Sequence, residues 1–158
     1  MKIKINHILS AIAAALLVLC VMSVWSPIRF SDIRSRREAI VKARLVEIRK
    51  AEEAYKKMNG CYAGSFRQLT DCQLLADSTR FIPYSGGEEF ELTATVHTGK
   101  SGTPTSIMEC GAPYTAYLKG LDENSVKEIT EEANSRGEYP GLKFGDITQP
   151  NDNAGNWE

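Results

Sequence analysis

The chain has 158 residues, of which 42% are hydrophobic and 25% are charged, and its formal net charge is −1. This length suits one domain with a hydrophobic core and is short for two. The charge is unevenly placed, because residues 1–37 carry six basic and one acidic side chain, whereas residues 38–158 carry 13 basic and 19 acidic ones. An acidic body without clustered lysine or arginine argues against nucleic acid as a partner.

The first predicted element is an apolar helix at residues 8–26, which follows a short tail at residues 1–7. The 18 positions from Ile8 to Trp25 would span roughly 27 Å as a helix, close to the ~30 Å hydrocarbon core of a bilayer. Trp25 would then lie at the membrane–water interface, where aromatic rings with a polar tip are common. We therefore predict a single-pass membrane anchor, with the lipid bilayer as a partner.

A cleaved secretory signal is the main alternative, because "MKIKINH" provides the basic start of such a signal. However, no small-x-small cleavage site follows, and the apolar run is longer than the ~7 to 15 residues usual in signals. A lipoprotein site at Cys20 is disfavoured by the bulky Leu19 before it. These features favour an uncleaved signal anchor.

The sequence gives two opposing indications of how this anchor is oriented. Four arginines lie at residues 29–37 and only two lysines precede the apolar run, which by the positive-inside rule places the domain in the cytoplasm. Three cysteines in the downstream domain favour an oxidising compartment, and long domains translocate largely regardless of charge. We predict that residues 1–7 are cytoplasmic and that the domain faces the periplasm or cell exterior from a bacterial inner membrane.

Residues 27–59 are predicted to form an amphipathic stalk helix. Pro27 is expected to kink or interrupt the helix, because proline has no amide donor. Apolar side chains then recur at steps of three, four or seven as far as Met58, and Asn59-Gly60 is a typical helix end. The stripe would pack on its own domain, especially in its C-terminal half, on another copy, or on both. The predicted association face, for a protein partner or self-association, consists of Ile33, Ile40, Leu45 and Ile48.

The remaining residues, 60–158, are predicted to form a small α+β domain outside the cytoplasm. Ser65 would cap a short helical turn after the stalk. Residues 90–97 alternate apolar and polar side chains, which predicts a strand with one buried face. Residues 105–110 would form the antiparallel return strand of a hairpin.

The last third of the chain is less regular. Residues 112–121 are ambiguous between a third strand and a loop. Within them, Tyr114 and Tyr117 are candidates for core packing or for an aromatic binding surface. One further helix is predicted to begin at Asp122 or Asn124, followed by a short strand at 142–144 and a polar tail.

The spacing of the cysteines suggests a small disulfide loop. Cys61 and Cys72 are eleven positions apart, and a bond between them would stabilise the fold by about 3 kcal/mol. Cys110 is a third candidate that could replace either partner. A metal site is the alternative, but it would need histidine or more cysteine nearby, and neither His7 nor His97 is close in sequence.

Motifs for catalysis or cofactor binding are weak. The stretch "ATVHTGKS", Ala94–Ser101, matches a loose phosphate-loop pattern, but it lacks the glycines and the following helix that bind phosphate. His97 with Glu91 or Glu109 is a conceivable acid–base pair, although no nucleophile accompanies it. The acidic run at residues 88–91 lacks the alternating oxygen ligands of a calcium loop. We predict no catalytic residue, metal or cofactor, and do not expect an enzyme.

The junction "AEEAYKKMNGCYAGSFRQL", placed after an apolar helix and before a small sheet, resembles type IV pilins and pseudopilins. In that family the long helix ends in an alanine-and-tyrosine stretch, followed by Asn-Gly, an aromatic residue and a short segment that ends in leucine. The matching positions are Ala51, Ala54, Tyr55, Asn59, Gly60, Tyr62, Ser65 and Leu69. The chain differs from the family in having no processing motif of Gly or Ala before Phe and no carboxylate before Asp32.

The resemblance implies a pilin-like fold, in which a membrane helix continues into a long amphipathic helix packed on a small antiparallel sheet. It also implies a structural or accessory role in an envelope or secretion assembly, with association through the N-terminal helix. The alternative is an anchored, non-polymerising domain that binds a ligand or partner outside the membrane.

Overall fold

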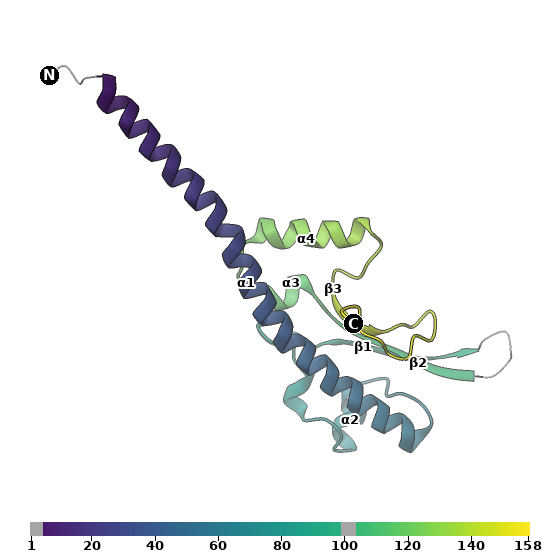
Figure 1. Cartoon of the computed structure of the whole chain (residues 1–158). Coiled ribbons are helices and arrows are strands. Elements are labelled where there is room, and N and C mark those ends of the chain that lie inside the picture. Colours follow the sequence, from purple (N-terminus) through teal and green to yellow (C-terminus); the bar gives the residue numbers. More distant parts are fainter. Residues whose placement is uncertain (1–4, 99–103) are drawn as a thin grey trace. The chain divides into compact units, whose positions relative to one another are not determined.

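The computed structural model describes residues 5–98 and 104–158, with side chains at 7–20, 28–98 and 104–158. The chain divides into two units, Met1–Ser35 and Arg36–Glu158. The first contributes the N-terminal part of the long helix α1 (Ile5–Asn59). The second contains the rest of α1 and all the other elements, which Figure 1 labels in chain order.

Helix α1 is continuous from Ile5 to Asn59, so the interruption expected at Pro27 is absent. A proline inside a helix removes one hydrogen bond, and the remaining bonds of a long helix can carry the chain past it. The end of the helix is as predicted. Gly60 adopts φ +79°, which suits glycine, and its amide donates to the carbonyl of Lys56 at 2.8 Å.

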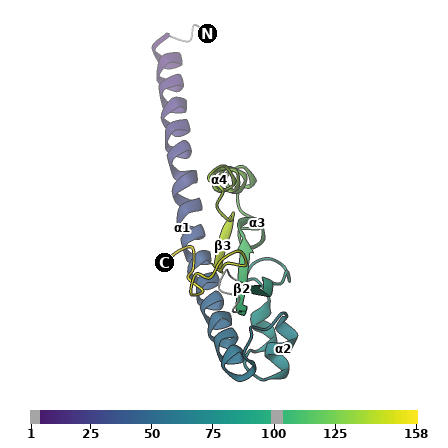
Figure 2. The same ribbon diagram turned by 90° about the vertical axis from the view of Figure 1, so that its right-hand side faces the viewer.

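The C-terminal half of α1 supplies one side of the hydrophobic core. Val41, Leu45 and Ile48 have no exposed surface, and Ala51 is also buried. Their spacing of three and four residues places them on one face of the helix. Two views at right angles show this half of α1 beside the sheet (Figure 1 and Figure 2).

Three antiparallel strands form the sheet, in the order β1-β2-β3. These are β1 (Glu91–Thr98), β2 (Pro104–Pro113) and β3 (Gly141–Gly145). Cys110 on β2 lies between Leu92 on β1 and Phe144 on β3, and both Cys110 and Phe144 are fully buried. The α+β class, with a long N-terminal helix and a small antiparallel sheet, is therefore confirmed. Val96 was expected on the buried face of β1, but its side chain is 58% exposed, close to the loop that joins β1 to β2.

The shorter helices connect these elements. Helix α2 (Phe66–Asp71) follows Ser65 as predicted, although the Ser65 side chain makes no capping bond. A 3-10 turn, η1 (Asp77–Arg80), leads toward the sheet. The ambiguous stretch after β2 contains a one-turn helix, α3 (Tyr114–Tyr117). The predicted further helix is α4 (Glu123–Ser135), capped by the Asp122 carboxylate, which accepts a hydrogen bond from the Ser125 amide at 2.8 Å.

The C-terminal segment is packed against the domain, although its composition suggested only a polar tail. The amide of Asn156 donates to the carbonyl of Lys143 at 2.9 Å, and Gly155 forms a bridge with Phe144, so this segment borders β3. Arg49 on α1 contacts the carboxylate of Glu158 at 2.9 Å. Hydrogen bonds of the backbone and of the Asn153 and Asn156 side chains, together with an ion pair, therefore hold the segment in place. Hydropathy gives no signal for such contacts.

Within the part of the chain that the structure describes, no helix combines the length and the apolar character that a membrane span requires. The predicted anchor at residues 8–26 includes residues 21–26, whose side chains lie outside the described residues. Trp25, which was predicted to lie at the membrane–water interface, is one of these residues.

The buried face of α1 predicts a sharp contrast between two aliphatic side chains. We expect Leu45→Ala to lower the free energy of unfolding by about 2 to 5 kcal/mol, because it removes fully buried methyl groups and leaves a cavity. Ile40→Ala, on the same helix but 43% exposed, should cost much less. Urea unfolding of the full-length chain in detergent checks this, and equal losses for the two variants would contradict this account of the core.

Candidate functional site

The N-terminal unit exposes an apolar helical surface. Seven large aliphatic side chains between residues 8 and 19 are each 49% to 67% exposed: Ile8, Leu9, Ile12, Leu16, Leu17, Val18 and Leu19. At about 100° per residue, five of the seven fall within one arc of roughly 100° on the helix, and only Leu17 and Val18 lie outside it. Contiguous exposed apolar surface of this kind marks an interaction site for protein or lipid.

The predicted association face is divided between two environments. Leu45 and Ile48 are fully buried in the core of the domain, so they are not available to a partner, and their assignment to an association face was wrong. Ile40 is exposed, and Ile33 lies within the N-terminal unit. The helical period alone could not separate them, because a continuous stripe serves a core and a contact surface equally well.

Three arginines of α1 join the helix to other segments through backbone carbonyls. Arg37 donates to the carbonyls of Tyr117 and Lys119, each at 3.0 Å. Arg44 donates to two carbonyls near η1, those of Ser78 and Phe81, each at 2.9 Å. Arg49 donates to the carbonyl of Asn153 at 3.1 Å. Hydrogen bonds from a charged donor are stronger than neutral ones, so these contacts fix the end of α3, the η1 turn and the C-terminal segment onto α1.

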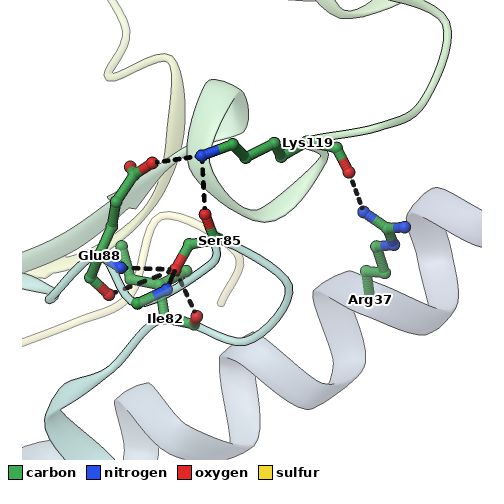
Figure 3. Close-up of polar contacts among 6 residues, drawn as sticks. Arg37, Ile82, Ser85, Glu88 and Lys119 are labelled. Carbon is green, nitrogen blue, oxygen red and sulfur yellow. Dashed lines mark hydrogen bonds and ion pairs between the residues drawn. The ribbon is translucent and has the colours of Figure 1, made fainter.

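A polar cluster around Ser85 extends the first of these contacts (Figure 3). The Ser85 hydroxyl is fully buried, donates to the carbonyl of Ile82 at 2.8 Å and accepts from the amide of Glu88 at 2.9 Å. Lys119 donates to the carbonyl of Ser85 at 3.0 Å and contacts the Glu88 carboxylate at 3.2 Å. Because the Lys119 carbonyl also accepts from Arg37, the turn at 82–88 is linked to α1 through Lys119.

The two tyrosines proposed as binding aromatics lie mainly inside the domain. Tyr117 is fully buried and Tyr114 is half-buried, with ring centroids 5.9 Å apart in an edge-to-face arrangement. The Tyr117 hydroxyl lies 3.4 Å from the carboxylate of Glu38 on α1. Tyr117 is therefore a core residue and not part of a binding surface, which corrects that alternative.

All four cysteines are free thiols in the structure. Cys61 and Cys72 are exposed, so a bond between them remains a prediction. Cys110 is buried, and burial raises the pKa of its thiol well above the usual value, with Glu52, Glu91 and Glu109 raising it further. A protonated, enclosed thiol is unreactive, so Cys110 is a poor bridging partner in the folded domain.

A buried carboxyl group lies on the inner face of α1. Glu52 has no exposed surface, and its Oε2 accepts a hydrogen bond from the amide of Ala63 at 2.8 Å. Its Oε1 has no hydrogen-bond partner among the described residues. Burial raises the pKa of Glu52 from its ordinary 4.5 to about 7, and the bond from Ala63 opposes this rise. The carboxyl therefore connects the end of α1 to the loop that follows it.

A groove of about 440 Å³ lies between α3 and α4. Leu118, Leu121 and Val126 give it an apolar lining, and Lys127 and Glu123 place opposite charges beside it. The groove is a possible ligand or partner site by size. Its charges of both signs do not favour one class of ligand.

The structure gives the other predicted motifs no catalytic setting. His97 is exposed on β1, opposite Thr105. Glu91 accepts from the Tyr139 hydroxyl at 2.9 Å, and Glu109 pairs with Lys143 at 2.8 Å, so both carboxylates considered for His97 have other partners. The phosphate-loop match continues β1 as far as Thr98, and its remaining positions, residues 99–101, lie outside the described residues. No cluster of three metal-ligating side chains occurs at residues 5–98 or 104–158.

Comparison with known proteins found no matching family model, no similar curated protein and no similar solved structure.

Sequence reasoning missed Glu52 and the three arginines. Glu52 carries a signal that can be read from its spacing, because it follows Leu45 by seven positions and Ile48 by four and so falls on the buried stripe. The arginines carry no such signal. Their acceptors are carbonyls of segments that come close only in the folded domain.

Glu52 makes stability depend on pH. Because its folded pKa of about 7 exceeds its ordinary 4.5, the protonated form is favoured in the folded state. The contribution of Glu52 to the free energy of unfolding is fully present below pH 4.5. It is lost as the pH rises to about 7, and the total loss is about 3 kcal/mol. Glu52→Gln keeps an acceptor for Ala63 and removes this titration.

We therefore expect Glu52→Gln to be more stable than the wild-type chain at pH 8, with the difference shrinking toward pH 4.5. Urea unfolding of both chains across this range measures it. The matched control is Glu53→Gln, which changes the exposed neighbouring carboxylate and should show no such trend. A difference for Glu52→Gln that is constant with pH would contradict the assignment.

Proposed function

We propose that the chain is a membrane-anchored structural or accessory subunit of a bacterial envelope or secretion assembly, similar in design to type IV pilins and pseudopilins. The observation that carries the proposal is the exposed apolar surface at residues 8–19 of α1. The same helix supplies the core of a small α+β domain with Val41, Leu45 and Ile48.

The proposed partner of the apolar surface is the lipid bilayer. A domain that needed this segment for its own core would bury these aliphatic side chains, and they are exposed instead. Two lysines precede the segment and four arginines follow it, so both ends carry groups that favour lipid headgroups. In this proposal the domain is held outside the cytoplasmic membrane, where Cys61 and Cys72 can form a disulfide.

The proposed contacts between subunits involve the outer face of α1. Ile40 is exposed and apolar at the start of the segment that belongs to the domain, and Ile33 precedes it by seven residues. Their spacing places both on one face of the helix, where a neighbouring helix could pack.

The second candidate function is an anchored domain that binds a partner and does not self-associate. The groove between α3 and α4 favours it, because its apolar lining is open to a ligand. The two functions differ in what contacts α1 in the membrane.

Amine-reactive crosslinking of the full-length chain in intact membranes tests the proposal. We expect a ladder of multiples of the chain, and we expect Ile40→Glu to reduce it severalfold, because a charge then lies in the helix contact. Met58→Glu is the matched control, since Met58 is also an exposed apolar residue of α1 but lies near its other end.

Only monomers, or one adduct with a different protein, would contradict the subunit and favour the binding domain. Equal ladders for both variants would contradict the proposed contact at Ile40.

A further inference from the structure

Strand β1 forms an open edge of the sheet. The far edge, at β3, is bordered by the C-terminal segment, with hydrogen bonds from Gly145 to Ala154 and from Asn156 to Lys143. Residues Glu91–Thr98 of β1 pair only with β2 within the described chain. Alternate amides and carbonyls of an edge strand point away from its sheet partner, so β1 presents unpaired backbone groups.

The middle of this edge, residues 92–96, lacks several features that usually prevent pairing between sheets. The register of β1 with β2 is one-to-one at all eight positions, so no bulge twists the edge away. The five residues from Leu92 to Val96 include no charge, proline or glycine. The side chain of Val96, which lies on the apolar face of the strand, is also 58% exposed. Natural proteins commonly protect an edge with lysine, proline or a bulge, and their absence here favours a partner strand.

We propose that β1 pairs edge to edge with β1 of a second copy of the chain, antiparallel about a two-fold axis at Ala94. In this register Ala94 lies opposite itself and Leu92 lies opposite Val96 of the other copy. On the other face Thr93 lies opposite Thr95, and Glu91 lies opposite His97. Two-fold symmetry makes each of these unlike pairs occur twice.

The complementarity of the strand with itself identifies the occupant as a second copy. Leu92 and Val96 share one face of β1 and meet as an apolar pair, which covers the exposed Val96 side chain. Glu91 and His97 share the other face and meet as a carboxylate and an imidazole. A shift by one residue would place the apolar face of one strand against the polar face of the other.

The environment of Glu91 allows this contact. Its Oε2 accepts from the Tyr139 hydroxyl at 2.9 Å, which holds the carboxylate beside the sheet. Its other oxygen has acceptor capacity for His97 of the second copy. The pairing extends the sheet from three strands to six.

Disulfide crosslinking of the full-length chain in detergent micelles tests the register. In the variant Ala94→Cys, the two cysteines would have Cβ atoms about 4.5 to 5.5 Å apart, so mild oxidation should give a dimer joined at position 94. In Thr98→Cys the two cysteines would lie eight positions apart, at roughly 26 Å, and should not bond. Peptide mapping by mass spectrometry separates these bonds from any made by the four native cysteines.

A charge exchange gives a second readout that does not depend on the new cysteine. His97→Glu places two carboxylates together at both ends of the contact and should weaken the dimer roughly tenfold. The double variant Glu91→His with His97→Glu should restore it. His97 is exposed, so folding is expected to be unaffected, and circular dichroism checks this.

Crosslinks at position 94 that form no faster than those at position 98 would overturn the proposal. So would a dimer that His97→Glu leaves unchanged, or capture at this edge of a different protein in place of a second copy. The pairing does not require a membrane anchor, so failure of this test leaves the proposed function standing, and the reverse also holds.

Discussion

Burial of one face of α1 against the sheet is the interaction on which the rest of this structure depends. Val41, Leu45 and Ile48 contribute the apolar contacts, and arginines on the same helix donate to carbonyls of three other segments. The sheet has three strands, and its hydrophobic face, which includes Cys110 and Phe144, is buried. The C-terminal segment and the loops then take positions set by contacts with α1 and the sheet, while α3 packs on β2, α4 on α3 and α2 on η1.

The same constraint determines which surfaces remain for function. The domain uses the inner face of the C-terminal half of α1, so the outer face at Ile40 stays available. Residues 8–19 take no part in the core, and their apolar side chains are exposed. At the sheet, β3 is bordered by the C-terminal segment while β1 is open. The proposed roles in anchoring and self-association use these surfaces, and none of them requires chemistry at a catalytic centre.

Much of the fold could be predicted from local patterns, and most of the candidate sites could not. The end of α1 at Asn59-Gly60, the hairpin and the cap at Asp122 all have signals within a few residues. Whether Leu45, Ile48 and Tyr117 pack in the domain core or contact a partner depends on which surface covers them, and periodicity does not identify that surface. The three arginines and the C-terminal segment bond to backbone groups that are distant in sequence. Such contacts leave no recognisable pattern in the sequence. Glu52 is the intermediate case, because its place on the stripe predicts burial but not its hydrogen bond with Ala63.

The central claim is that α1 is divided between two environments, with its C-terminal half in the domain core and its apolar N-terminal segment in lipid. Extraction of native membranes with alkaline carbonate, followed by mass measurement of the chain, tests this most directly. The account predicts that the chain stays in the membrane pellet with residues 8–26 still attached. A chain released into the supernatant, or a soluble product trimmed after that segment, would contradict it.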